Sequence, residues 1–195
     1  MFIIEPHIKG LIFDCDGTLA NTMPLHYLAW EETMQAHHAH FPEQLFYDLA
    51  GIPSDKIVMI LNETFGYALD PLAIADQKEK TFFKKHLPET RPIEPVAAIA
   101  RRYKGQLPMA VATGGIAAVA QRVLQAIGLA DFFEAVVTAD DVVHGKPAPD
   151  IFIEAARRIN IAPQFCHVFE DSDLGLTGAG KAGMSASDIR LWTAA

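Results

Sequence analysis

The most informative segment of the chain reads Lys9-Gly10-Leu11-Ile12-Phe13-Asp14-Cys15-Asp16-Gly17-Thr18-Leu19. Its apolar run Leu11-Ile12-Phe13 is short enough to form a buried strand, and two acids follow directly. Carboxylates at the end of a buried strand are costly unless a cation or hydrogen bonds replace their hydration. Alternate residues of a strand share a face, so Asp14 and Asp16 could converge, although Asp16 could already lie in the loop. The alternative for this segment alone is an ordinary Asp-Gly turn.

Length, composition and charge limit the classes of protein to which this chain can belong. The chain has 195 residues, 50% of them hydrophobic, which suits one domain or a core with a small insert. Its net charge of −8 argues against a surface built for nucleic acid or an anionic membrane. The two cysteines make no disulfide framework, and neither a signal peptide nor a membrane span is evident. We therefore expect a cytoplasmic protein without a nucleic-acid or membrane partner; no protein partner can be inferred.

The remaining sequence divides into a helical part and an alternating part. Helical periodicity dominates from about residue 22 to residue 87, with Ser54 as a candidate N-cap and Pro88 as the end of a helix that begins at Pro71. Helix and strand patterns then alternate, with strand candidates at 109–112, 133–138, 165–169 and 184–188. Such alternation predicts an α/β fold, a parallel sheet with helices on both faces. The helical part is then an insert after the first strand.

Polar or glycine-rich sequences follow the strand candidates. They are Asp14-Cys15-Asp16-Gly17-Thr18, Thr113-Gly114-Gly115, Gly145-Lys146-Pro147 and Glu170-Asp171. Because open α/β sheets bind ligands at the carboxyl ends of their strands, we expect these residues to meet at one edge. Taken singly, each has an ordinary explanation as a turn, a solvated lysine or a helix start. Their common placement favours a functional site.

The residue types indicate phosphoryl transfer with a hard cation. Asp14, Asp16 and Asp171 offer the oxygen ligands that suit Mg²⁺. Thr113 and the backbone N–H groups beside it can hold phosphate oxygens at a helix start. Lys146 adds a positive charge that can offset the carboxylates and stabilise the transferring group.

Together these sequences resemble the four motifs of the haloacid dehalogenase superfamily. The matching residues are Phe13-Asp14-Cys15-Asp16-Gly17-Thr18-Leu19, Thr113-Gly114, Gly145-Lys146-Pro147-Ala148-Pro149-Asp150 and Phe169-Glu170-Asp171-Ser172. The helical insert and the Lys-Pro-Ala-Pro-Asp run resemble the β-phosphoglucomutase-like branch, and the short C-terminus resembles its small fructose-1-phosphate or 6-phosphogluconate phosphatases. The resemblance implies a Rossmann-like core of residues 1–19 and 88–195. Residues 20–87 would form an all-helical cap with hinges near 20–22 and 88–92.

The resemblance also implies roles for single residues. Asp14 would attack phosphorus and become an aspartyl-phosphate, and Asp16 would protonate the leaving oxygen and later take a proton from water. Thr113 and Lys146 would hold the phosphoryl group. Mg²⁺ would be bound by the Asp14 carboxylate and the Asp16 backbone carbonyl.

Two further acids and four further residues complete the expected site. Asp171 would bind the metal, and Glu170 would either contact it or support its ligands. The substrate-binding candidates are Thr18, Gly114, His26 and Lys78, the last two matching a cap histidine and a cap lysine of the branch. As alternatives, His26 could lie on a helix surface and Lys78 in a solvated charged run. The His37-His38-His40 cluster is interpreted as a solvated turn rather than a metal site.

The sequence departs from the branch at two positions. Asn21 stands where an acid is common, and Ser54 stands where the mutases have an arginine that grips a second phosphate. The second departure favours a Mg²⁺-dependent phosphatase that acts on a small phosphorylated sugar or sugar acid. The alternatives are a β-phosphoglucomutase-type isomerase with the same nucleophile and a non-catalytic binding protein on the same fold.

Overall fold

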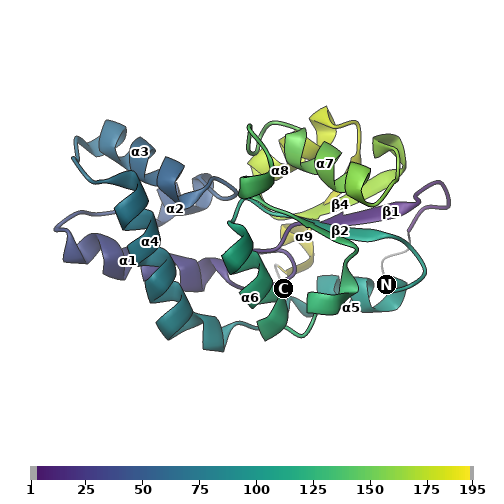
Figure 1. Ribbon diagram of the computed structural model, residues 1–195, viewed down its shortest axis with the longest axis horizontal. Helices are drawn as coiled ribbons and strands as arrows, with labels where there is room; N and C mark the ends of the chain where they lie inside the picture. Colours follow the sequence, from purple (N-terminus) through teal and green to yellow (C-terminus); the bar gives the residue numbers. More distant parts are fainter. Residues whose placement is uncertain (1–3, 194–195) are drawn as a thin grey trace.

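The computed structural model describes residues 4–193 and shows a helix-covered sheet beside a separate group of helices (Figure 1). Within these residues the sheet has five strands in the order β3-β2-β1-β4-β5, and every neighbouring pair is parallel. The strands are β1 (Gly10–Phe13), β2 (Met109–Ala112), β3 (Ala135–Val137), β4 (Cys166–Glu170) and β5 (Ser185–Asp188). The predicted α/β fold is confirmed.

The central strand is apolar because both of its faces are covered. Leu11 and Phe13 pack in one hydrophobic cluster with α5 (Glu94–Tyr103) and α6 (Ala117–Ala126). Ile12 points the other way, into a cluster with α7 (Asp150–Arg158) and α8 (Asp173–Lys181). Figure 1 shows the two helix pairs on opposite faces of the sheet. Burial on both sides removes the polar alternation of a half-exposed strand, leaving the short apolar run seen in the sequence. The short helix α9 (Arg190–Thr193) follows β5.

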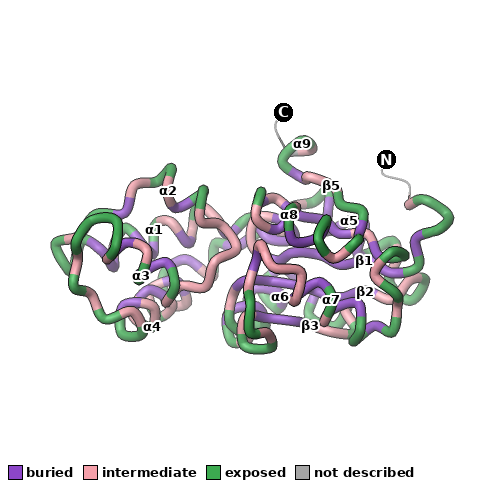
Figure 2. Tube along the Cα trace, turned by 90° about the horizontal axis from the view of Figure 1, so that it is seen from above, coloured by how far each residue is buried: buried purple, intermediate pink, exposed green. Residues whose placement is uncertain are grey.

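The insert is helical throughout and has its own apolar core. It comprises α1 (Met23–Ala36), α2 (Glu43–Asp48), α3 (Ser54–Phe65) and α4 (Pro71–Thr81). Trp30, Phe46 and Leu61 are among the buried residues that hold these helices together. Figure 2 shows the insert as a body beside the sheet, joined to it at a narrow waist. Two crossing segments lie side by side at that waist: Ala20 pairs with Pro92, and the Asn21 N–H donates to the Arg91 carbonyl at 2.9 Å.

Element ends in the insert differ from the prediction in two places. The regular helix α4 stops at Thr81 and continues as a π-helical turn, Phe82–His86, and a 3₁₀ turn, Leu87–Glu89. Pro88 lies in the first part of that 3₁₀ turn, where its missing N–H is not needed, so it does not end the α-helix. Ser54 is not an N-cap: Pro53 occupies that position, and the Ser54 hydroxyl instead donates to Glu79 at 2.8 Å.

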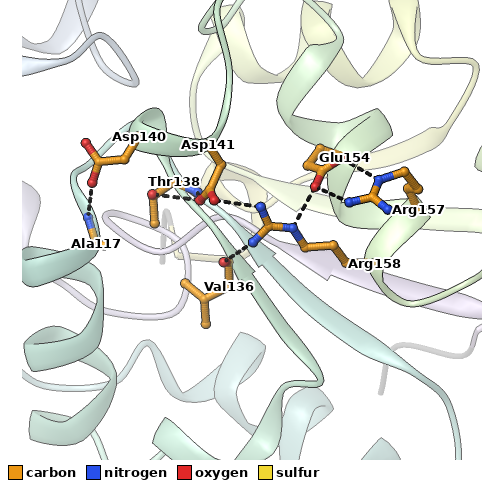
Figure 3. A network of polar contacts seen from close by, with 8 residues as sticks. All are labelled: Ala117, Val136, Thr138, Asp140, Asp141, Glu154, Arg157 and Arg158. Carbon is orange, nitrogen blue, oxygen red and sulfur yellow. Dashed lines mark hydrogen bonds and ion pairs between the residues drawn. The ribbon is translucent and has the colours of Figure 1, made fainter.

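The start of the loop between β3 and α7 is held by the charged side chains of Asp140, Asp141 and Arg158 (Figure 3). Asp141 accepts hydrogen bonds from the backbone N–H and hydroxyl of Thr138, both at 2.9 Å. Arg158 of α7 donates to Asp141 at 2.6 Å, and Asp140 accepts from the Ala117 N–H at 2.9 Å. The start of this loop is therefore tied to both α6 and α7. No helix within residues 4–193 combines the length and apolar character needed to cross a membrane.

Candidate active site

The carboxyl ends of four strands and the insert enclose one cleft. Asp14 follows β1, Thr113 follows β2, Lys146 lies in the loop after β3, and Glu170 is the last residue of β4. The lining residues of the core include Asp14, Asp16, Thr113, Gly114, Lys146, Glu170 and Asp171; those of the insert include His26, Gly51, Ser54, Lys78 and Glu79. The structure thus brings together all the sequence-predicted site residues except Thr18.

Lys146 is the centre of charge in the core half of the cleft. Its side chain is fully buried, and its Nζ donates to Asp14 Oδ1 at 2.6 Å and to Glu170 Oε1. Burial alone would lower the pKa of Lys146, but the two carboxylates outweigh burial and raise it. The ammonium therefore stays charged, and the residue is not a solvated loop lysine.

Three carboxylates gather next to this ammonium. Ligand atoms of Asp14, Glu170 and Asp171 lie within 4.8 Å of one another. Burial, opposed in part by Lys146, raises the pKa of Asp14 well above its ordinary value. Burial, followed by the charge of Glu170, raises the pKa of Asp171 to about 7. Such mutual repulsion fits a divalent cation with oxygen ligands, so the donor set suits Mg²⁺.

The Asp16 carboxylate does not join this group. Its Oδ1 accepts from the Thr22 hydroxyl at 2.6 Å and lies 3.2 Å from His26 Nε2. Burial would raise the pKa of Asp16, but His26 and the Thr22 hydrogen bond outweigh burial and lower it. Any metal contact of this residue would therefore use the backbone, as the resemblance implies.

His26 links Asp16 to the lysine of the insert. Lys78 Nζ lies 2.9 Å from His26 Nδ1 and donates to Glu79 Oε1 at 3.0 Å. An ammonium can only donate, so His26 Nδ1 accepts and the ring proton lies on Nε2, facing Asp16. His26 stacks on Phe82 with centroids 3.9 Å apart, and Lys78 is only 4% exposed. The surface alternatives for both residues are wrong.

Thr18 differs from its predicted role. It is fully buried, does not line the cleft, and its hydroxyl donates to Asp171 Oδ1 at 2.8 Å. Gly17 permits this arrangement: its φ is +86°, and a Cβ there would lie 2.1 Å from Asp171 Oδ2. Thr18 therefore positions a carboxylate instead of contacting substrate. His37, His38 and His40 are exposed and lie outside the carboxylate group, as a solvated turn requires.

Gly114 lets the insert approach the sheet edge. A Cβ on Gly114 would lie 2.1 Å from the carbonyl oxygen of Gly51, a contact no rotamer can relieve. Gly114→Ala should therefore hold the insert away from the core and lower kcat/KM about tenfold or more, while the unfolding temperature changes by only a few degrees. Ala182→Gly, away from the cleft, is the comparison for a glycine–alanine exchange. Unchanged steady-state kinetics in Gly114→Ala would contradict the role of this close approach.

Three residues of the site were missed by sequence reasoning. Glu79 accepts from Lys78 and Ser54; Thr22 donates to Asp16; and Ser172 donates its N–H and hydroxyl to Glu170 Oε2 at 2.6 and 3.0 Å. Ser172 stands in the fourth motif and could have been found there. Glu79 and Thr22 have no motif signal, because their roles depend on contacts made by folding.

Comparison with known proteins identifies the family of this chain. The family model for haloacid dehalogenase-like hydrolases matches residues 8–183. The fructose-1-phosphate phosphatase YqaB of Escherichia coli is 40% identical over 182 residues, which cover 93% of this chain and 96% of that protein. The β-phosphoglucomutase of Bacillus subtilis is 26% identical, with 93% and 83% covered.

A solved structure has the same architecture. The crystal structure of CbbY from Rhodobacter sphaeroides in complex with phosphate superposes with a TM-score of 0.82 at 25% identity and covers 92% of this chain and 84% of its own. The resemblance noted from the four motifs is confirmed. The chain belongs to the haloacid dehalogenase-like hydrolase family.

Proposed function

We propose that the protein is a Mg²⁺-dependent phosphatase that hydrolyses a small sugar phosphate through an aspartyl-phosphate on Asp14. One observation supports this most: Asp14 is held by Lys146 beside Asp171 and lines a cleft whose other wall is the helical insert. The E. coli relative, named as a fructose-1-phosphate phosphatase, supports the same reaction and substrate class.

The residues of the core divide the chemistry between them. Asp14 and Asp171 would hold Mg²⁺, with Glu170 beside them, and the ion would supply positive charge for the carboxylates and the phosphoryl oxygens. An Asp14 oxygen attacks phosphorus as the bond to the sugar oxygen breaks. Lys146 and Thr113 stabilise the charge on the transferred group.

Asp16 moves the protons. In its protonated form it would donate one proton to the departing sugar oxygen; the resulting carboxylate would then take one from the water that hydrolyses the aspartyl-phosphate, which restores Asp14 and releases phosphate. His26 and Thr22 hold its carboxylate in place for both steps. We further propose that residues 20–87 act as a cap that turns about the paired segments at Ala20 and Pro92 and excludes water on closing.

The test is phosphate release across a panel of sugar phosphates, with Mg²⁺ and with a chelator. We expect release from hexose monophosphates that falls by at least about a hundredfold on chelation and returns when Mg²⁺ is restored. Full activity with chelator present would contradict the metal assignment. Interconversion of glucose 1-phosphate and glucose 6-phosphate in the presence of a bisphosphate, without phosphate release, would establish the mutase alternative. No reaction on any phosphomonoester would favour a binding protein.

A further inference from the structure

One carboxylate oxygen of the insert, Glu79 Oε2, has no hydrogen-bond partner in the described part of the chain. Glu79 lines the cleft, and its Oε1 accepts from Lys78 Nζ at 3.0 Å and from the Ser54 hydroxyl at 2.8 Å. Its Oε2 is buried and unpaired within the described residues 4–193. Buried polar atoms are nearly always paired, so an unpaired oxygen on a residue that lines the cleft points to a donor supplied by the ligand.

Glu79 is ionised in this setting. Burial alone would raise its pKa, but the charge of Lys78 and the hydrogen bonds from Ser54 and Lys78 act against burial, and the pKa of Glu79 is lowered. The unpaired oxygen is therefore a carboxylate acceptor, which forms its strongest hydrogen bonds with O–H or N–H donors and repels anions.

The positive charges around the cleft are already paired. Lys78 and Lys146 are the lysine and arginine side chains that line it in the described part of the chain. Lys146 is bound to Asp14 and Glu170, and Lys78 is bound to Glu79 and faces the His26 ring. Among the described residues, the part of the cleft lined by the insert thus offers a carboxylate acceptor and no unpaired lysine or arginine for a second anion.

We propose that Glu79 determines substrate specificity: Oε2 accepts a hydrogen bond from a hydroxyl at the end of the substrate remote from its phosphate, and its charge disfavours substrates with a carboxylate or second phosphate there. This inference rests on the proposed phosphatase function and narrows it. Of the phosphorylated sugars and sugar acids that the sequence left open, the neutral polyhydroxylated monophosphates fit this cleft.

Glucitol 6-phosphate and 6-phosphogluconate test the proposal as a matched pair. They share one carbon skeleton and differ at C1, which is a hydroxymethyl group in the first and a carboxylate in the second. The wild-type protein should show a kcat/KM at least about tenfold higher on glucitol 6-phosphate, because a like charge against a buried carboxylate is strongly unfavourable.

Glu79→Gln keeps the shape of the side chain and removes its charge. The ratio of kcat/KM on 6-phosphogluconate to that on glucitol 6-phosphate should rise about tenfold or more, since the amide can donate and Lys78 loses its partner. Glu79→Asp keeps the charge but shortens the side chain, which moves the acceptor oxygen away from the substrate. The kcat/KM on glucitol 6-phosphate should therefore fall, without an increase in kcat/KM on 6-phosphogluconate. Glu63→Gln, an exposed change on α3, should leave both values unchanged.

Each outcome decides the proposal separately from the phosphatase function. Hydrolysis of both compounds by wild type with equal kcat/KM, or a preference for 6-phosphogluconate, overturns the role of Glu79 and leaves the phosphatase intact. An unchanged ratio in a folded Glu79→Gln variant, with circular dichroism like that of wild type, does the same. Absence of hydrolysis of either compound and of p-nitrophenyl phosphate by wild type overturns the phosphatase and the inference together.

Discussion

Asp14→Asn is expected to abolish turnover, lowering kcat by at least about four orders of magnitude. The amide has the shape of the carboxylate but is a very poor nucleophile, so no aspartyl-phosphate can form. The measurement is phosphate release under saturating substrate and Mg²⁺, together with mass spectrometry of the protein after rapid quenching. Wild type should show an added phosphoryl group, and the variant should not.

The fold should survive this substitution. Burial raises the pKa of the Asp14 carboxyl, which means that the buried negative charge is itself unfavourable, and a neutral amide removes that cost. The variant should therefore unfold within a few degrees of the wild type. Asp131→Asn, at an exposed site of the core, is the matched control and should retain full activity. A kcat within tenfold of wild type in Asp14→Asn would remove this residue as nucleophile.

Lys146→Met should reduce both activity and stability. Met replaces the ammonium with an apolar group of similar length, which leaves Asp14 and Glu170 without their shared partner in a buried setting. Removing one partner of a buried ion pair typically costs about 3–5 kcal/mol of unfolding free energy. The loss of positive charge beside the transferred phosphoryl group should also lower kcat by about a hundredfold or more.

The stability loss of Lys146→Met should be larger at high pH than at low pH. Burial and the charge of Glu170 raise the pKa of Asp171 to about 7 in the folded protein, from the ordinary value of 3.8 that it regains on unfolding, so between these two values the folded state binds more protons. Stability contributed by this group is therefore present at low pH and is lost as pH rises towards 7. The charge of Lys146 lowers the pKa values of Asp14 and Asp171. Its removal should therefore raise both pKa values further and increase the loss of stability at higher pH.

Denaturant unfolding of metal-free protein at pH 5 and pH 8 measures this dependence. The deficit of Lys146→Met relative to wild type should be larger at pH 8. Lys84→Met, at an exposed position, is the control for the change of residue type and should unfold like wild type at both values. A deficit that is equal at both values, or larger at pH 5, would contradict the electrostatic explanation.

Much of the core could be predicted from local sequence because its signals are local. A strand buried on both faces needs a continuous apolar run, which Leu11-Ile12-Phe13 provides, and parallel strands place their carboxyl ends at one edge. Asp14 directly follows β1 and Glu170 is the last residue of β4, so their meeting follows from topology. Lys146 lies further along, in the loop between β3 and α7, and topology places only the start of that loop at the same edge. The alternation of helix and strand patterns in the sequence is sufficient to predict the parallel sheet without any side-chain contact.

The insert shows where local patterns are insufficient. Lys78 lies in a charged run that is typical of a solvated helix face, yet it is buried against Trp30 and Phe82 and contacts a histidine 52 residues away. Thr18 belongs to the first motif, yet its hydroxyl reaches Asp171, 153 residues further on. Neither partner can be identified from spacing, because the approach depends on how whole elements pack.

The sequence alone predicted that acids and a lysine follow the strands of the sheet and that a helical insert follows the first strand. Only the tertiary structure decided which of these side chains contact one another and which of them line the cleft. It placed Gly51 against Gly114, directed the Thr18 hydroxyl to Asp171, and left Glu79 Oε2 without a hydrogen-bond partner among residues 4–193. Residue types are properties of single positions, whereas burial, hydrogen-bond partners and shifted pKa values arise from neighbours brought together by folding.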